Sequence, residues 1–307
     1  MLALLSAVVI IIPLGILNIA IHLNSAGGKN GTRVMQNFTN RKVFPSQKYD
    51  IIFLGDSRVL TGINPEFFER KLNCTAFNAA FAGGGVNGQL YRHTAEKLLS
   101  NNTNAPRAVV IGITPLTMGQ RARNNHQITQ TKKEFASQNN SVLFEYIQIP
   151  FQKIRTKYVK ALFKKKVYTT IPYENGYLER FAKVSKKAQE NSINTYRLFF
   201  KNYQFSQESL QELSEYIRIW KKENVTVFAF RPPTNISMDT LENESGKCDF
   251  SLIQRTVEKS GGVWLEVNER ETYNSYDSSH LTSTEAKRLS EDLSEKIATY
   301  FRNRRLP

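Results

Sequence analysis

Short apolar segments alternate with amphipathic helical segments along most of this chain of 307 residues. The apolar, β-rich segments occupy residues 49–54, 75–79, 108–113, 225–230 and 263–267. Helical patterns lie between them and after the last one. An alternation of this kind predicts an α/β fold, with a parallel sheet covered by helices on both faces. In such a sheet, ligands bind beyond the carboxyl ends of the strands.

Capping signals indicate where several of these helices begin. Asn64 precedes Pro65, which gives a cap followed by a proline at the first helical position. Ser206 precedes a segment whose apolar residues follow helical spacing. Thr282 and Glu285 have the spacing of a capping box at the start of the last helix.

The first 23 residues contain no Lys, Arg, Asp or Glu. An apolar segment of roughly 20 residues is long enough to cross a bilayer, so we expect 1–23 to be a single transmembrane anchor and 24–48 a polar linker. The alternative is a cleaved signal peptide, although such peptides have a basic start that this segment lacks. The basic residues that follow the segment favour a cytoplasmic body, whereas the function considered below favours the extracytoplasmic side.

The region from 49 to 307 forms the predicted α/β domain, interrupted by an insertion over 115–205. Residues 115–201 contain 17 Lys and Arg, 5 Glu and no Asp, a net charge of +12 out of +15 for the whole chain. We interpret this insertion as a mostly helical subdomain. Its basic surface either contacts anionic lipid headgroups or an anionic polymer, which we favour, or is an ordinary solvated face. No nucleic-acid recognition motif is present, so nucleic acid is not an expected partner.

Two short motifs carry the candidate chemistry. A buried strand ends in Gly55-Asp56-Ser57, and the segment before the last helix contains Asp277 three residues ahead of His280. A serine hydroxyl needs a base to become a nucleophile, and the base needs a partner on its far ring nitrogen. Ser57, His280 and Asp277 therefore form a candidate catalytic triad. The residue types present indicate no metal site and no cofactor.

These motifs resemble the first and last sequence blocks of the SGNH/GDSL hydrolase superfamily. The segment from Asn78 to Gly83 resembles the second block. The resemblance implies a flavodoxin-like, three-layer α/β/α fold. It also implies that Ser57 is the nucleophile, His280 the base, Asp277 the group that orients the base and Gly83 a donor of the oxyanion hole. Asn78 either braces the oxyanion loop or caps a turn. It is greatest for membrane-anchored proteins linked to O-acetylation of cell-surface polysaccharides.

The third block departs from the pattern. The family usually supplies an asparagine after the third strand, but this chain reads Gly112-Ile113-Thr114-Pro115. Thr114 and Thr117 are the nearby substitutes, and the loss of one oxyanion donor typically costs about 10²–10³ in rate. Arg58 and Arg231 are further candidates for contact with substrate. The alternative is that each is an ordinary charged residue, Arg58 in the turn of Ser57 and Arg231 at the end of a strand. Cys74 and Cys248 leave open whether a disulfide forms.

The function expected from the sequence is that of a membrane-anchored serine acyl esterase or O-acetyltransferase. Its substrate would be an acyl ester on a cell-envelope glycan. Two alternatives remain. The missing asparagine favours a non-catalytic binding or assembly protein of the envelope on the same fold. The anchor and the basic surface suggest an esterase that acts on membrane lipid.

Overall fold

The computed structural model describes residues 47–82, 94–102, 105–120 and 168–305, together with the isolated positions Phe38 and Lys42. Residues 45–125 and 168–307 belong to one compact unit, to which the description below applies. The predicted anchor over 1–23, most of the predicted linker and residues 121–167 of the predicted insertion lie outside the described residues. Within the described ranges, no helix has both the length and the apolar character of a membrane span.

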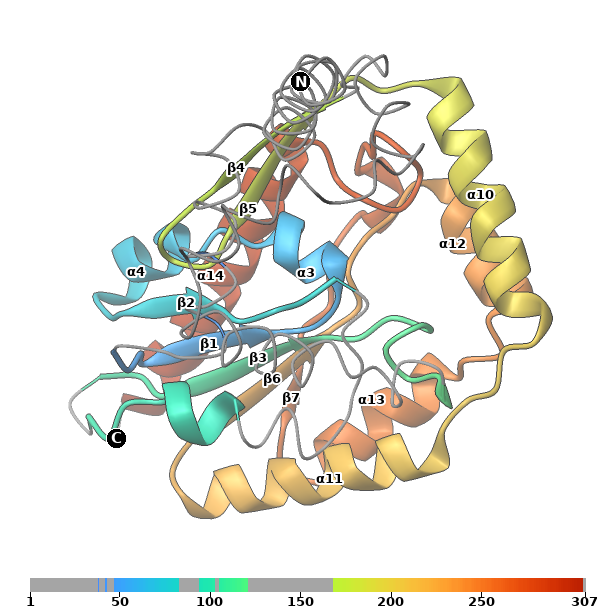
Figure 1. Ribbon diagram of the computed structural model, residues 1–307. Helices are drawn as coiled ribbons and strands as arrows, with labels where there is room; N and C mark the ends of the chain where they lie inside the picture. The colour runs from blue at the N-terminus through green and yellow to red at the C-terminus, as the bar shows by residue number, and fades with distance from the viewer. Residues whose placement is uncertain are drawn as a thin grey trace, which may run out of the picture. The chain divides into compact units, whose positions relative to one another are not determined.

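Five parallel strands form the central sheet (Figure 1). They are β1 (Ile51–Leu54), β2 (Ala76–Asn78), β3 (Ala108–Gly112), β6 (Thr226–Phe230) and β7 (Val263–Trp264), and their order is β2-β1-β3-β6-β7. All five predicted strands are confirmed. Counted along the chain, this order is 2-1-3-4-5, which is the order of flavodoxin-like sheets. The order reverses at β1, so the carboxyl ends of β1 and β3 flank the position where such sheets bind ligands.

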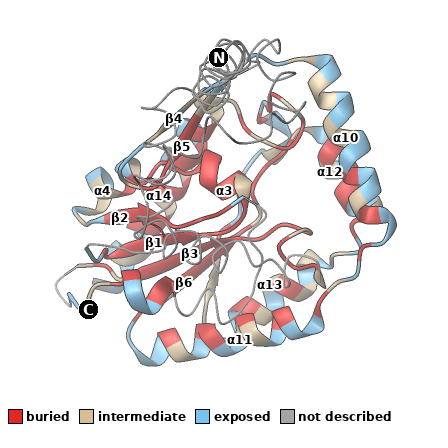
Figure 2. Ribbon diagram, viewed as in Figure 1, coloured by how far each residue is buried: buried red, intermediate tan, exposed pale blue. Residues whose placement is uncertain are grey.

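Helices cover both faces of the sheet. One group consists of α3 (Ser57–Gly62), α4 (Glu66–Leu72) and α14 (Ser283–Arg305), of which α14 packs on the other two. The other group, α11 (Gln207–Lys222) and α13 (Phe250–Lys259), packs on β6 and β7. Between them, β1, β2, β3 and β6 are almost wholly buried, whereas both residues of β7 are only partly buried (Figure 2). This burial on two faces explains why the strands read as continuous apolar runs rather than as alternating ones.

The predicted caps are formed, with one shift. The Ser206 hydroxyl accepts a hydrogen bond from the Ser209 N–H at the start of α11, and the Thr282 hydroxyl accepts one from the Glu285 N–H at the start of α14. At α4 the cap position is Pro65, one residue later than predicted, although the Asn64 side chain still accepts from the Glu66 N–H.

The described part of the predicted insertion contains β-structure as well as a helix. It contains an antiparallel hairpin of β4 (Tyr168–Pro172) and β5 (Leu178–Ala182), followed by α10 (Lys186–Lys201). The hairpin was not predicted, because the prediction relied on the charge pattern and overlooked the Asn175-Gly176 turn signal. Gly176 has a φ of +80°, which glycine adopts without strain. The hairpin packs on α3 and α14, so residues 168–205 are part of the same compact unit as the sheet.

Another helix, α12 (Ile236–Ser245), packs beside α10 and was not predicted. The two cysteines, Cys74 and Cys248, are both free thiols, so the disulfide that the sequence left open does not form.

Candidate active site

The turn that carries Ser57 follows directly from the sheet. β1 ends at Leu54, and Gly55 has a φ of +154°. A Cβ atom at Gly55 would lie 2.4 Å from a methyl group of Val59, so only glycine fits here without displacement. Asp56 then caps α3 by accepting a hydrogen bond from the Arg58 N–H at 2.9 Å. Ser57 is therefore the first residue of a helix, where the backbone N–H has no acceptor within the helix.

The turn that carries His280 is organised by the carboxylate of Asp277. One oxygen accepts hydrogen bonds from the N–H groups of Ser279 (3.1 Å) and His280 (2.8 Å). The other oxygen lies 2.9 Å from Nδ1 of the His280 ring. Between them, Ser278 has a φ of +71° and thus lies in the left-handed region. Asp277 thus shapes the loop and orients the imidazole at the same time.

The structure brings Ser57, His280 and Asp277 together. The Oγ atom of Ser57 lies 2.8 Å from Nε2 of His280, across 223 positions of sequence. Because Nδ1 faces a carboxylate, the neutral ring carries its proton on Nδ1 and presents Nε2 as an acceptor to the Ser57 hydroxyl. This is the geometry that lets a histidine remove the serine proton. The side chains of His280 and Asp277 are 14% and 22% exposed, so the site is reachable from solvent.

The charge of Asp277 fits this arrangement. Burial alone would raise its pKa, but the hydrogen bonds from the side chain and backbone of His280 outweigh burial and hold the pKa below its ordinary value of 3.8. The carboxylate is therefore ionised at neutral pH, and it stabilises a positive charge on His280 when the ring takes up a proton.

The oxyanion hole predicted from the sequence is only partly accounted for. Gly83 lies outside the described residues. The residues just before it run beside the nucleophile turn, since the Phe81 N–H donates to the Gly55 carbonyl at 3.2 Å. Asn78 is fully buried, and its amide nitrogen donates to the carbonyls of Val59 and Ile63 at 2.9 and 2.8 Å. Its two N–H bonds are thus used in holding α3, so it braces the turn and does not serve as an oxyanion donor.

The two threonines considered as substitutes for the missing asparagine are also engaged. The Thr114 hydroxyl donates to Asp56 at 2.8 Å, and the Thr117 hydroxyl donates to the Thr114 carbonyl at 2.9 Å. Both side chains are buried. Their hydroxyls stabilise the turns after β1 and β3, so neither one replaces the asparagine.

Neither of the arginines considered for substrate contact is free in the structure. Arg58 is buried and donates to Glu242 of α12 at 2.5 Å and to the Ser279 hydroxyl at 3.1 Å. Burial opposes its charge, but the carboxylate of Glu242 outweighs burial, so the pKa of Arg58 is raised. Arg231 pairs with Asp239 at 3.0 Å and with Glu242 at 3.2 Å, and its side chain is only 10% exposed. Both arginines therefore belong to ion pairs behind the triad.

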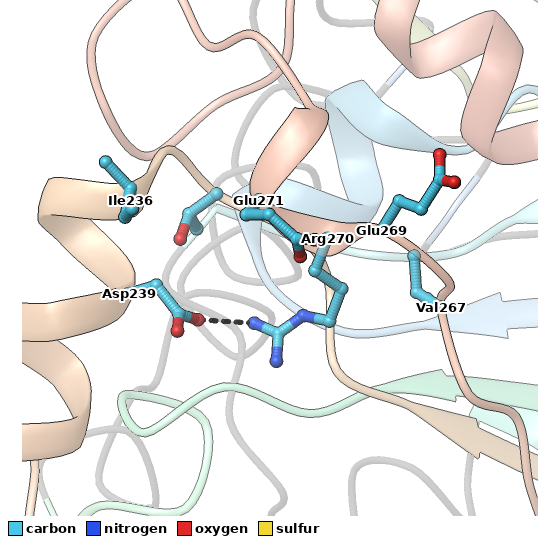
Figure 3. A pocket seen from close by; sticks show the side chains of 7 residues that line it. Ile236, Asp239, Val267, Glu269, Arg270 and Glu271 are labelled. Atoms are coloured by element: carbon cyan, nitrogen blue, oxygen red, sulfur yellow. Dashed lines mark hydrogen bonds and ion pairs between the residues drawn. The ribbon is translucent and has the colours of Figure 1, made fainter.

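A cavity of about 220 Å³ lies at the end of this set of ion pairs (Figure 3). The guanidinium group of Arg270 reaches across it to Asp239 at 2.7 Å. None of the three triad residues is among its lining residues, which are Thr234, Ile236, Asp239, Val267, Glu269, Arg270 and Glu271. The cavity is thus separate from the candidate catalytic centre.

Sequence reasoning missed three residues that support the triad, namely Tyr196, Glu242 and Ser279. The Tyr196 hydroxyl lies 2.7 Å from the Ser279 hydroxyl, and its ring faces the Arg58 guanidinium at 5.5 Å. Ser279 lies inside the Asp-x-x-His motif, and this position was the only feature of the sequence that could have indicated its role. Nothing in the sequence links α10 or α12 to that motif.

Comparison with known proteins does not identify the chain. No family model matches it, and no curated protein matches it. Among solved structures, one provisionally described as a platelet activating factor from Streptococcus pneumonia has a TM-score of 0.42 and 11% identity, and covers 86% of this chain and 91% of its own. A second structure, provisionally described as an acylhydrolase from Bacteroides fragilis NCTC 9343, has a TM-score of 0.42 and 9% identity. The match covers 87% of this chain and 96% of that chain.

A third solved structure, the inhibitor-bound form of an aryl esterase from M. Smegmatis, has a TM-score of 0.35 and 8% identity, and covers 83% of this chain and 99% of its own. All three TM-scores are below 0.5. The function must therefore be argued from the site itself.

Proposed function

We propose that this protein is a serine acyl esterase or O-acyltransferase that uses Ser57 as nucleophile, His280 as general base and Asp277 as the group that orients the base. The observation that carries the proposal is the continuous hydrogen-bonded array from the Ser57 hydroxyl through both ring nitrogens of His280 to the Asp277 carboxylate. A serine, a histidine and a carboxylate in this order are the groups of acyl transfer.

In the proposed reaction, Oγ of Ser57 attacks the ester carbonyl while Nε2 of His280 takes its proton. The backbone N–H of Ser57 is placed to donate to the resulting oxyanion. His280 then gives the proton to the departing alcohol, which leaves an acyl group on Ser57. Water or an acceptor hydroxyl, activated by the same histidine, removes the acyl group and regenerates the serine.

The proposed substrate is an acetyl or similar ester on a cell-envelope glycan. Two sequence features support this choice, namely the uncharged segment 1–23 and the basic stretch 115–201. Together they fit a single-pass anchor and a domain that works near an anionic surface or polymer, and a glycan substrate requires that domain on the extracytoplasmic side. The family resemblance at Ser57 and His280 points in the same direction.

A fluorophosphonate probe and a chromogenic acetyl ester test the reaction. The wild-type protein should be labelled and should hydrolyse the ester, whereas Ser57→Ala should not be labelled. Ser57→Ala and His280→Ala should each lose about 10⁴-fold or more in kcat, because what remains comes from binding and the oxyanion hole alone. Ser251→Ala removes an exposed serine outside the triad and should be labelled like wild type.

A non-catalytic binding protein is the second candidate, and the engagement of Thr114 and Thr117 favours it, because neither hydroxyl replaces the missing asparagine. Labelling of the wild type but not of Ser57→Ala by the fluorophosphonate probe would reject this alternative. A phosphatase or fluorescent reporter at the C-terminus tests the location, since a cytoplasmic body would rule out the glycan substrate.

A further inference from the structure

We propose that Arg58 is a positioning residue, which holds the turn of Ser57 and the loop of His280 at a fixed separation. This inference rests on the proposed function, because it concerns the same two catalytic groups. Arg58 was considered from the sequence as a substrate contact. Its surroundings point to a different role.

Two hydrogen bonds link the consecutive residues Ser57 and Arg58 to the consecutive residues Ser279 and His280. Ser57 Oγ bonds Nε2 of His280 at 2.8 Å, and Nε of Arg58 bonds Oγ of Ser279 at 3.1 Å. Since Arg58 follows Ser57 and Ser279 precedes His280, the four residues form a closed ring of two covalent and two hydrogen-bonded links. The Arg58–Ser279 bond therefore constrains the distance across which the serine proton must move.

Arg58 is itself held by two neighbouring helices. Glu242 of α12 accepts from its Nη2 at 2.5 Å, and both side chains of this pair are at most 2% exposed. The ring of Tyr196 on α10 lies against the guanidinium, and its hydroxyl meets the same Ser279 oxygen at 2.7 Å. The Ser279 hydroxyl is thus held from two directions, and the ring of four residues cannot shift without moving α10 or α12.

Stability is a weak reason for a buried arginine at this position. Burying an ion pair costs desolvation energy that the pair often only just recovers, and apolar residues of similar volume are frequently as stable. What arginine supplies is a rigid planar group with donors in several fixed directions. Here those directions are used for Glu242 on one side and Ser279 on the other. Lysine could keep the ion pair but has no second, fixed donor for Ser279.

The set of ion pairs offers a matched control at its far end. Glu242 also binds Arg231, Arg231 binds Asp239, and Asp239 binds Arg270 at the cavity in Figure 3. Arg270 also pairs with a carboxylate, although its side chain is 23% exposed against 2% for Arg58, and its bond to Asp239 does not reach the loop of His280. A loss of charge pairing can therefore be separated from a loss of contact with Ser279.

The test compares Ser279→Ala, Arg58→Lys, Arg58→Met and Arg270→Met on the chromogenic ester. Ser279→Ala and Arg58→Lys should lower kcat about 10- to 100-fold with KM within about twofold, the scale of one or two hydrogen bonds. Ser279→Ala should lower kcat less in the Arg58→Met background than in wild type, because both substitutions remove the Arg58–Ser279 bond and only the bond of Ser279 to Tyr196 is left to lose. Arg270→Met should lower the melting temperature and leave kcat at the wild-type value.

Hydrogen exchange of the loop 275–281 gives a readout that needs no turnover. Exchange there should be about tenfold faster in Ser279→Ala and Arg58→Lys and unchanged in Arg270→Met. Unchanged exchange, or a fall in kcat that merely follows the melting temperature in all variants including Arg270→Met, would overturn the positioning role. An inactive, unlabelled wild type would instead overturn the proposed function, and the exchange result would still decide whether Arg58 holds the loop.

Discussion

The two halves of the candidate triad are held in place by different means. Ser57 lies in the short turn directly after β1. This turn is fixed by the backbone geometry of Gly55 and by the cap from Asp56. His280 stands in an irregular loop with little secondary structure of its own. That loop is held by side chains from α3, β5, α10 and α12, through the pairs Arg58–Ser279, Arg180–Tyr276, Gln189–Ser275 and Asn235–Ser278.

This difference has a consequence for mutations. The Ser57 turn shares the stability of the buried sheet, so damage to it should appear as lower stability of the whole domain. The His280 loop depends on separate hydrogen bonds, each with a net contribution of about 1 kcal/mol. Damage to the loop should therefore reduce activity more than it reduces stability.

The sharpest test on the loop side is Asp277→Asn. Asparagine keeps an oxygen for the N–H groups of Ser279 and His280 but favours the wrong tautomer of the ring. We expect kcat/KM to fall by about 10⁴-fold, with a melting temperature close to that of wild type. A variant that unfolds would show instead that Asp277 matters mainly for the structure of the loop.

The same substitution predicts a change in acid stability. Because the folded-state pKa of Asp277 is below 3.8, its contribution is fully present above that pH and is lost as the pH falls through the folded pKa. The free energy of unfolding, measured with denaturant from pH 5 to pH 2, should therefore fall less steeply in Asp277→Asn than in wild type. Parallel curves would contradict this.

On the nucleophile side, Asn78→Ala should mainly affect stability. It removes the hydrogen bonds that the Asn78 side chain makes to the carbonyls of Val59 and Ile63 and to the N–H of Ala80, all in a buried place. We expect the free energy of unfolding to fall by about 3 kcal/mol, given about 1 kcal/mol for each of the three hydrogen bonds lost. Asn191→Ala, at an exposed position of α10, is the control and should change it by less than about 0.5 kcal/mol.

Gly55→Ala should show a smaller effect of the same kind. The new methyl group meets Val59 at 2.4 Å, and alanine is strained at a φ of +154°. Together these cost about 1–3 kcal/mol, measurable by chemical denaturation. A variant with full stability and reduced activity would show that this turn behaves like the His280 loop, which would remove the contrast between the two halves.

Tyr276→Phe should have the smallest effect. It removes the hydroxyl that accepts from Arg180 at 2.6 Å but keeps the ring that stacks on His280 at a centroid distance of 5.9 Å. We expect about a two- to tenfold lower kcat, the scale of one partly exposed hydrogen bond, and an unchanged melting temperature. A large loss of stability would mean that the loop is part of the cooperative core.

The sequence was sufficient for the parts that local patterns determine. All five strands, the caps at Ser206 and Thr282, and the residues of the triad were predictable, because periodicity and short motifs report on neighbouring residues. The bonds of Arg58 to Ser279 and Glu242 span 221 and 184 positions, and, unlike Ser57 and His280, these side chains are not paired by any motif or by the family resemblance. The engagement of Thr114 by Asp56 was hidden for the same reason.

The β4–β5 hairpin has a consequence for the solubility of the domain. β2 is an outer strand of the sheet, and an outer strand with free backbone groups is a template for pairing with other chains. Here the Asn175 carbonyl accepts from the Asn78 N–H at 2.8 Å, and Gly176 lies too close to the Asn78 carbonyl for any side chain to fit between them. The hairpin, which lies between β3 and β6 in the sequence, thus shields the edge of the sheet at β2. A shortened chain without the hairpin should aggregate through β2.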